Sequence, residues 1–390
     1  MRVTKLFRDF FKSEKTGGLL LIVNTILSLI IANVILGSDY IQFWQLKVGG
    51  LSIEHWANDF LMAIFFLLIG LELEREIYKG ELSNIKNALL PIFGAIGGML
   101  VPASIYMYFN FGTVTQSGAG IPMATDIAFA VGILSLLGKR VPISLKVFLI
   151  ALAVIDDLGA IIIIAIFYTK TLVWINLLIA LGIFGVLLIF NRLKINNLIP
   201  YVIGGLTMWY FMLHSGVHAT ITGVLLAFAI PFGDGGKKSA SYILQHVLHK
   251  PVAFIILPIF ALANTAIILS PDIGQTLIQN YSLGIAIGLI IGKPLGIFLF
   301  TLLAVKFGFC KLPDDLNWKL ILGVGFLAGI GFTMSIFITL LAFDNDTIIN
   351  NSKFVILLSS LIAGIIGFLS LNIFLKKRKR PDIKRQQLIV

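Results

Sequence analysis

Two adjacent carboxylates, Asp156 and Asp157, lie midway along the apolar run 142–168. That run is long enough for a spanning helix, which needs about 20 apolar residues. Placing one ionisable side chain at that depth of the membrane costs roughly 2.5–3.5 kcal/mol. Two neighbouring carboxylates are therefore expected to face a water-filled cavity and to contact cations. Carboxylates are hard oxygen ligands and suit Na⁺, Li⁺ or H⁺ better than soft metals. The pair indicates a cation site, with a purely structural ion pair as the alternative.

Lys293 is the candidate partner of these carboxylates, because it lies in the middle of another apolar run, within Gly292-Lys293-Pro294-Leu295-Gly296. Adjacent residues of a helix point about 100° apart, so one aspartate can bind a cation while the other meets an internal partner. Pro294 removes a hydrogen-bond donor from the helix at this point. A fixed counter-charge and an ion pair that opens as ions arrive are both compatible with the sequence.

Two further segments predict helices that are interrupted inside the membrane. Segment 122–128 contains Thr125 and Asp126, residue types that favour helix starts over helix interiors. Segment 329–335 combines glycines with hydroxyl side chains. Interrupted helices of opposite orientation mark an inverted repeat with an ion site at their crossing. Like helix ends then lie together, so we expect Asp126 to compensate the positive ends and Lys293 the negative ends.

The composition places these segments in a polytopic all-α membrane protein. The chain is 58% hydrophobic and only 13% charged, with a mean hydropathy of +0.98, whereas soluble domains are about 25% charged. We expect one transmembrane domain over residues 1–390 with about twelve spans, the first of them a retained helix and not a signal peptide. The predicted spans are 17–36, 58–78, 88–110, 121–138, 142–168, 173–193, 199–216, 217–232, 247–269, 283–308, 318–343 and 353–377.

The basic residues predict the orientation of these spans. With the N-terminus inside, most of the 30 Lys and Arg fall in inner segments or in the tail, and only Lys47, Lys170 and Lys353 fall in outer ones. This bias predicts that both termini are cytoplasmic. It also explains the net charge of +11 without a nucleic-acid partner, and we interpret the basic tail as a topology anchor in contact with lipid headgroups.

The segment between Gln45 and Glu54 differs from the rest of the chain. Two short extended pieces flank Gly49-Gly50, which predicts a β-hairpin on the outer side of the membrane. An ordered loop is one interpretation. The other is an exposed edge that pairs with a second copy of the chain.

Five blocks in this order resemble the NhaA-type sodium/proton antiporters along nearly the whole chain. The blocks are Ala124-Thr125-Asp126-Ile127-Ala128-Phe129-Ala130, Ile155-Asp156-Asp157-Leu158-Gly159-Ala160-Ile161, Ser215-Gly216-Val217-His218-Ala219-Thr220, Gly292-Lys293-Pro294-Leu295-Gly296-Ile297 and Gly329-Ile330-Gly331-Phe332-Thr333-Met334-Ser335-Ile336-Phe337. The general association of crossing interrupted helices with inverted repeats is itself drawn partly from this family, so it adds no independent support.

The resemblance implies a role for each matching residue. Asp156 and Asp157 match the aspartates that bind the ion and carry protons, and Thr125 and Asp126 match the broken-helix residues beside the site. Lys293 matches a lysine that pairs with an aspartate or balances helix ends. The resemblance also implies electrogenic exchange, with more protons imported than Na⁺ ions exported, and a homodimer formed through an outer hairpin such as that between Gln45 and Glu54.

Regulation by pH is a further implication of the resemblance. Glu72 and Glu76, beside Arg75, match a cytoplasmic ion funnel and pH-sensing cluster, for which a solvated helix end is the alternative. The histidines that match those linked to the pH response are His218, His246 and His249. The chain departs from the family at Gln245, where the best-known members carry a glutamate, so the pH of activation is not predicted. A metal site at His246 and His249 is not expected, because further ligands are lacking.

We therefore expect a secondary Na⁺(Li⁺)/H⁺ antiporter of a bacterial inner membrane, with no cofactor. Na⁺ and H⁺ would compete for Asp156 and Asp157. An intramembrane aspartyl protease that uses Asp126 with one of these aspartates is an alternative, but Lys293 would disrupt a shared proton. A cation channel is a third possibility, and it predicts Na⁺ flux without proton counter-transport.

Overall fold

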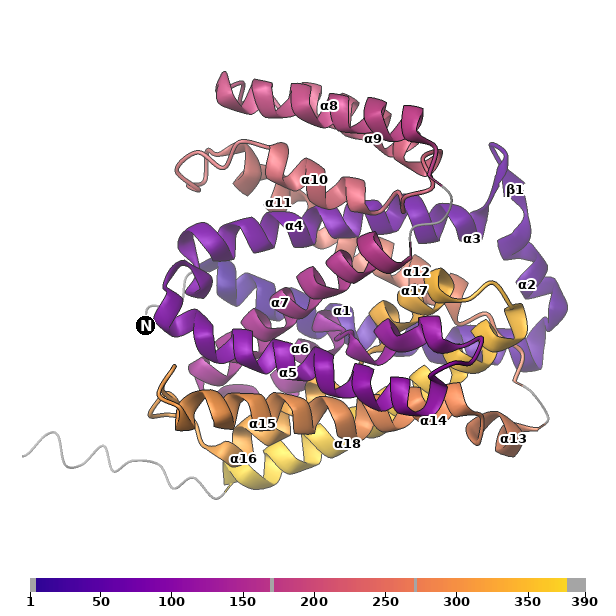
Figure 1. Ribbon diagram of the computed structural model, residues 1–390, viewed down its shortest axis with the longest axis vertical. Coiled ribbons are helices and arrows are strands. Elements are labelled where there is room, and N and C mark those ends of the chain that lie inside the picture. The colour runs from indigo at the N-terminus through magenta and orange to yellow at the C-terminus, as the bar shows by residue number, and fades with distance from the viewer. Residues whose placement is uncertain (1–4, 169–171, 270–271, 377–390) are drawn as a thin grey trace, which may run out of the picture.

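The computed structural model describes residues 5–168, 172–269 and 272–376, and the chain there is almost entirely helical (Figure 1). The α-helices are α1 (Lys5–Ile30), α2 (Ser38–Gln45), α3 (Ile53–His55), α4 (Met62–Lys79), α5 (Ile85–Asn110), α6 (Ile127–Leu136), α7 (Ile143–Phe167), α8 (Trp174–Arg192), α9 (Ile199–Leu213), α10 (Ile221–Ala229), α11 (Ala240–Pro251), α12 (Leu257–Asn264), α13 (Ile273–Leu277), α14 (Asn280–Ile287), α15 (Lys293–Lys306), α16 (Trp318–Ala328), α17 (Phe332–Ala342) and α18 (Asp346–Lys376). Shorter 3₁₀ segments are η3 (Glu81–Ser83), η4 (Gln116–Met123) and η5 (Gly138–Arg140), and π-helical segments are η1 (Ile31–Ile35), η2 (Trp56–Leu61), η6 (Val252–Ile256) and η7 (Gly288–Gly292). Lys170 and the basic residues beyond Lys376 lie outside the described residues.

Long apolar helices make this a multi-pass membrane protein. In the described part of the chain, nine helical stretches are long and apolar enough to cross a bilayer, or ten if the bent pair α16 and α17 is counted as one span. These ten coincide with ten of the twelve predicted ranges. The two exceptions are 199–216 and 217–232.

The seventh and eighth predicted spans correspond to the short helices α9 and α10. Helix α9 has 15 residues and α10 has nine, and at 1.5 Å per residue neither alone crosses a hydrocarbon core of about 30 Å. The chain turns between them at Gly216, whose φ of 86° lies in the left-handed region. The prediction of about twelve spans is therefore not confirmed.

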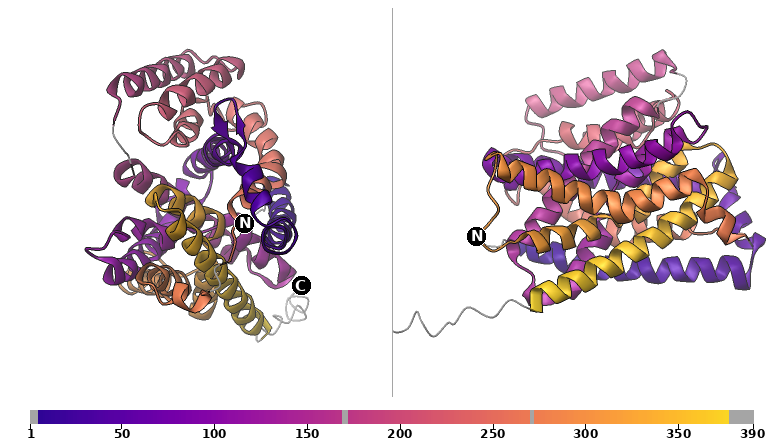
Figure 2. Two further views of the ribbon diagram at one scale, coloured as in Figure 1. Left: turned by 90° about the vertical axis from the view of Figure 1, so that its right-hand side faces the viewer. Right: turned by 60° about the horizontal axis from the view of Figure 1, so that its bottom comes forward.

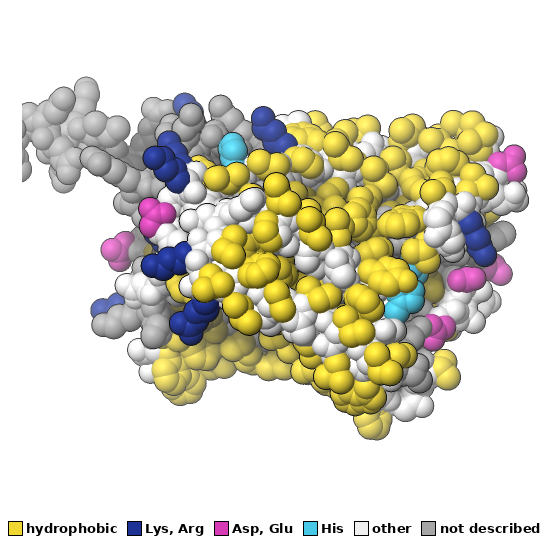
Figure 3. Space-filling view, turned by 90° about the horizontal axis from the view of Figure 1, so that it is seen from above, with side chains coloured by type: hydrophobic (Ala, Val, Ile, Leu, Met, Phe, Trp, Pro, Cys, Tyr) yellow, Lys and Arg dark blue, Asp and Glu magenta, His cyan; other side chains and the backbone are white. Residues whose placement is uncertain are grey.

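The surface has the distribution of side chains that a bilayer requires. Figure 3 shows a broad hydrophobic belt, with Lys and Arg gathered mainly at one end of the molecule. Helix α8 contributes much of the exposed apolar surface, because it lies at the edge of the bundle and packs on α9 and α10 (Figures 1 and 2). The start of α1 and the end of α18 lie at the same end of the bundle, and β1 lies at the opposite end.

Small residues allow two pairs of helices to pack backbone against backbone. A Cβ atom added to Gly97 of α5 would collide with the carbonyl oxygen of Gly296 on α15, and one added to Gly296 would collide with that of Gly97. In the same way, Gly223 of α10 lies against the Ala63 carbonyl of α4. Such contacts are typical of membrane helices, which lack a hydrophobic drive to associate and depend on close packing. The contact between α5 and α15 fixes the position of Lys293, one turn before Gly296.

A two-stranded antiparallel sheet, β1 (Lys47–Val48) and β2 (Leu51–Ser52), lies between α2 and α3. Lys47 pairs with Ser52, and Val48 pairs with Leu51. The two turn residues, Gly49 and Gly50, have φ values of 64° and 90°. Tight two-residue turns favour glycine at such positions because the backbone must enter the left-handed region.

Candidate ion-binding site

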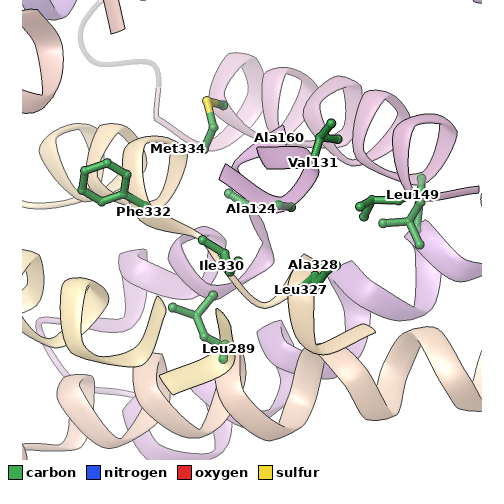
Figure 4. Packing of buried hydrophobic residues seen from close by; sticks show 14 of the residues in the cluster. Ala124, Val131, Leu149, Ala160, Leu289, Leu327, Ala328, Ile330, Phe332 and Met334 are labelled. Carbon is green, nitrogen blue, oxygen red and sulfur yellow. The ribbon is translucent and has the colours of Figure 1, made fainter. Parts of the chain in front are cut away.

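Two interrupted helices meet at the centre of the bundle. Segment η4 ends at Met123 and α6 starts at Ile127, while α16 and α17 are bent by 48° at residues 329–331. The two breaks touch directly, because the backbone N–H of Asp126 donates to the carbonyl of Ile330 over 2.7 Å. Figure 4 shows the crossing enclosed by buried apolar side chains, among them Ala124, Leu289 and Ile330. The interruptions therefore lie in a region from which bulk water is excluded.

Asp126 lies at the N-terminal ends of both half-helices that start at the crossing. Its Oδ1 accepts a hydrogen bond from the backbone N–H of Phe129 in α6 (2.9 Å). Its Oδ2 accepts from the backbone N–H of Thr333 in α17 (3.1 Å) and from the Thr333 hydroxyl (2.5 Å). A helix start leaves several N–H groups without partners and carries a partial positive charge. One carboxylate thus caps two helices, which is the geometry that compensation of their positive ends by Asp126 requires.

The opposite ends, where two half-helices stop, meet a cation and a hydroxyl. The ammonium of Lys293 donates to the carbonyl of Met123, the last residue of η4. The Thr125 hydroxyl lies 2.9 Å from the carbonyl oxygen of Ala328, the last residue of α16. These carbonyls carry the partial negative charge of a helix end, and the Lys293 ammonium lies against the one from η4.

Asp156 is the carboxylate that Lys293 contacts. The Lys293 Nζ lies 2.6 Å from the Asp156 Oδ2, and the Thr125 hydroxyl lies 2.7 Å from the same oxygen. All three side chains are almost completely buried. The π-helical turn η7 and the missing N–H of Pro294 loosen the backbone just where Lys293 enters the site.

Asp157 lies next to this ion pair and is equally buried, at 1% exposure. Neither of its carboxylate oxygens, nor the Oδ1 of Asp156, has a hydrogen-bond partner among the residues that the structure describes. A buried carboxylate oxygen without a partner is costly, and such oxygens in proteins are normally hydrogen-bonded or paired with a cation. The three oxygens have the chemistry to hold a small hard cation or a proton.

The residues assigned to pH regulation do not all lie together. His249 of α11 lies 4.0 Å from Glu72 of α4, and Gln245 of α11 lies near the same carboxylate. One turn along these helices, the Arg75 guanidinium lies 4.8 Å from the ring centre of Tyr242, and His246 stacks on that ring at 6.2 Å.

The remaining two of these residues, Glu76 and His218, have different surroundings. Glu76 lies on α4, one turn beyond Glu72. The Nε2 of His218 contacts the Tyr168 carbonyl (2.8 Å) at the end of α7. His218 therefore contacts the end of α7, whereas His249 contacts α4.

Four polar residues that the sequence did not single out as site residues are part of these networks. Thr333 holds Asp126, and Ser335 donates to the carbonyl of Ile121. Ser360 of α18 accepts from the backbone N–H of Phe332 at the start of α17. Glu74 is buried and receives a hydrogen bond from Ser241 of α11 (3.3 Å). Thr333 and Ser335 are within the glycine-rich motif 329–335, which was the available signal for both.

Comparison with known proteins identifies the family. The family described as Na⁺/H⁺ antiporter 1 matches residues 8–371. The chain belongs to this family. It is 74% identical over 376 residues to a protein of Flavobacterium psychrophilum named Na(+)/H(+) antiporter NhaA, with 96% of this chain and 98% of that protein covered. A protein of Cytophaga hutchinsonii with the same name is 63% identical over 377 residues, covering 97% of both chains.

A solved structure shares the fold of this Na⁺/H⁺ antiporter 1 family member at low sequence identity. It is the sodium proton antiporter MjNhaP1 from Methanocaldococcus jannaschii at pH 8, with a TM-score of 0.50, 17% identity, and coverage of 94% of this chain and 93% of that one. The family is one of transporters and not of enzymes, so the protease and channel alternatives have no support from the comparisons.

Proposed function

We propose that this chain exchanges Na⁺, and also Li⁺, for H⁺ by using Asp156 and Asp157 as one shared site. The observation that carries the proposal is the buried Asp157 carboxylate, which has no hydrogen-bond partner in the described part of the chain, beside the ion pair of Asp156 with Lys293. The names of the relatives, which are Na(+)/H(+) antiporters, agree with this substrate pair.

Competition between the two substrates follows from the chemistry of the carboxylates. A proton on Asp157 removes the charge that attracts Na⁺, and a bound Na⁺ occupies the oxygens that a proton needs. Either occupant reduces the negative charge of the site, which lowers the cost of moving it through an apolar interior. The empty, charged site cannot change sides of the membrane. Each change of side therefore carries either Na⁺ or H⁺, in one direction.

The exchange is electrogenic in this proposal. Two carboxylates can carry two protons inward, whereas one Na⁺ leaves, so each cycle moves net charge across the membrane. The membrane potential then contributes about 2.3 kcal/mol per elementary charge per 100 mV to the direction of transport. Lys293 takes part in one of two ways. Its ion pair with Asp156 persists as a fixed counter-charge, or the pair opens when the occupant of the site changes.

The wider assignments are also proposals. We propose one transporter domain over residues 1–390 in a bacterial inner membrane, with both termini in the cytoplasm, since the basic residues favour that orientation. The crossing of two interrupted helices supports an inverted-repeat architecture with twelve membrane segments, the seventh and eighth being short. No cofactor is needed for this exchange.

Dimerisation and pH regulation complete the proposal. The strands β1 and β2 form a short hairpin with exposed Leu46 and Val48, a surface suited to pairing with a second copy. Regulation by pH is assigned to Glu72, Glu76, His218, His246 and His249. The contacts of Glu72 with His249 and Gln245 support a linked cluster between α4 and α11.

The experiment that tests the proposed function is proton movement in everted membrane vesicles that contain this chain. A pH-sensitive dye reports dequenching after addition of Na⁺, Li⁺ or K⁺ at several pH values. We expect Na⁺ and Li⁺ to release protons and K⁺ not to do so. Absence of Na⁺-driven proton movement at every pH, with the protein present in the membrane, would contradict the proposal.

A further inference from the structure

A second ion pair, in which the lysine is buried, lies at the end of the bundle that carries β1 and β2, away from the ion site. The Nζ of Lys353, in the first turns of α18, lies 3.7 Å from the Oε1 of Glu54 in α3. Lys353 is almost completely buried, at 4% exposure, whereas Glu54 is partly exposed. The other carboxylate near enough to influence Lys353 is Asp346 on the same helix. Glu54 is thus the partner that Lys353 finds outside α18.

Glu54 and Lys353 belong to two different groups of packed helices within the chain. Glu54 closes the hairpin, because its Oε2 accepts a 2.6 Å hydrogen bond from Gln45, and the Ile53 N–H donates to the Leu46 carbonyl. The surrounding segment buries Tyr40 and Trp44 against α12 and η1. The hairpin is therefore anchored on that side of the molecule, independently of α18.

Helix α18, by contrast, supports the interrupted helix at the ion site. The Ser360 hydroxyl oxygen accepts a hydrogen bond from the backbone N–H of Phe332 at the start of α17 (3.1 Å). The Leu327 side chain occupies the space where Gly367 has no Cβ, and Ile330 packs against Gly364. Helix α18 also contacts η7, the turn that precedes Lys293. Helix α18 is therefore packed directly against the crossing and against the turn that precedes Lys293.

The geometry of the pair suits a contact that opens. At 3.7 Å the contact is longer than a hydrogen bond, which for nitrogen and oxygen is about 2.7–3.2 Å. The Glu54 carboxylate is held by Gln45, so the flexible lysine stem can leave without disturbing the hairpin. Buried ion pairs contribute little net stability, because desolvation offsets their attraction, and their best-supported use is to specify one arrangement over another.

We propose that Glu54 and Lys353 form a latch between the hairpin segment and α18, which opens whenever the ion site opens toward the hairpin end of the bundle. The inference rests on the proposed function, since it assigns the latch to the transport cycle. While the latch is closed, α18 and the crossing are held against the hairpin side. When it opens, α18 is free to move with α16 and α17.

Cross-linking gives the direct test. In a C310S background, which removes the single cysteine, the E54C/K353C variant is reconstituted in vesicles and linked with a short bifunctional thiol reagent that is cleaved by reduction. We expect the linked protein to lose Na⁺-driven proton flux and to recover it on reduction. The matched control is H55C/D59C, whose parent side chains lie 2.8 Å apart within one helical stretch; linking these should leave the flux intact.

The outcomes separate the latch from the proposed function. Flux in both the unlinked and the fully linked E54C/K353C protein would overturn the latch and leave the antiport intact. No flux in the unmodified protein would contradict the proposed function itself. No flux in the unlinked variant, with flux in the unmodified protein, would overturn the latch, because an open latch should not block transport. A second variant, K353M, removes the latch without cross-linking. We expect a higher maximal rate with an unchanged KM for Na⁺, and a maximal rate equal to or below that of the unmodified protein would overturn the latch.

Discussion

The Lys293 ammonium lies 2.6 Å from one oxygen of Asp156 and also donates to the Met123 carbonyl at the end of an interrupted helix. One side chain therefore meets two negative groups, a carboxylate from α7 and a helix end from η4. This leaves the neighbouring Asp157 without a hydrogen-bond partner among the described residues. The division of roles between two adjacent aspartates is the basis of the predictions that follow.

Replacing Asp157 by asparagine should abolish Na⁺-driven proton flux in vesicles. The amide cannot exchange a proton and carries no charge to attract Na⁺, although it has nearly the same size. The matched control is D314N, which makes the same change at an exposed position and should retain the flux. Retained exchange in D157N would show that the site lies elsewhere.

The ion pair of Lys293 with Asp156 should show strong coupling in thermal unfolding of the purified protein. Removal of one partner leaves a buried charge unpaired, so D156N and K293M should each lose about 3–5 kcal/mol of stability. The double variant D156N/K293M should recover most of that loss, because no unpaired charge remains. If the two losses simply added in the double variant, the charges would not be coupled as the geometry indicates.

Asp126 should act as a cap for two helices and not as an exchangeable site. Loss of one N-terminal cap costs about 0.5–2 kcal/mol, and D126A removes the acceptor for both α6 and α17. We expect a larger fall in unfolding temperature for D126A than for D126N, whose amide oxygen still accepts a hydrogen bond. Equal effects of the two substitutions would argue against the capping role.

Close packing of α5 on α15 should make Gly296 sensitive to one added methyl group. A Cβ there would collide with the Gly97 backbone, and such overpacking costs about 1–3 kcal/mol. The displaced α15 would also move Lys293, so G296A should lose both stability and flux. The control G182A lies on α8, where an added Cβ meets open space, and it should leave both unchanged. A neutral G296A would show that the contact between α5 and α15 can relax.

The charged residues of the proposed ion site could be predicted from the sequence, because a charge at membrane depth needs a partner. That argument indicates Asp156 and Lys293, whereas Asp126 is indicated by the preference of Thr and Asp for helix starts. The structure brings all three to one crossing. The hydrogen-bond partner of Asp126 could not be predicted from the sequence. Thr333 lies 207 residues away along the chain, and only the three-dimensional crossing of the two helices places it there.

Other features escaped sequence reasoning for different physical reasons. Hydropathy does not register the left-handed turn at Gly216, so the ranges 199–216 and 217–232 were counted as two spans, where the structure has the short helices α9 and α10. Glu74 gave no signal of its own, because its partner Ser241 is an ordinary hydroxyl on another helix. The pairing of Glu54 with Lys353 joins distant parts of the chain, and nothing local in either segment indicates it.

The most direct test of the central claim is Na⁺ binding by the purified protein, measured by calorimetry over a series of pH values. If Na⁺ and H⁺ share Asp156 and Asp157, acidification should weaken binding, and the apparent Kd should rise about tenfold per pH unit for each competing proton once the carboxylates are protonated. D157N should show no saturable binding. An apparent Kd that stays constant from acid to alkaline pH would contradict the account.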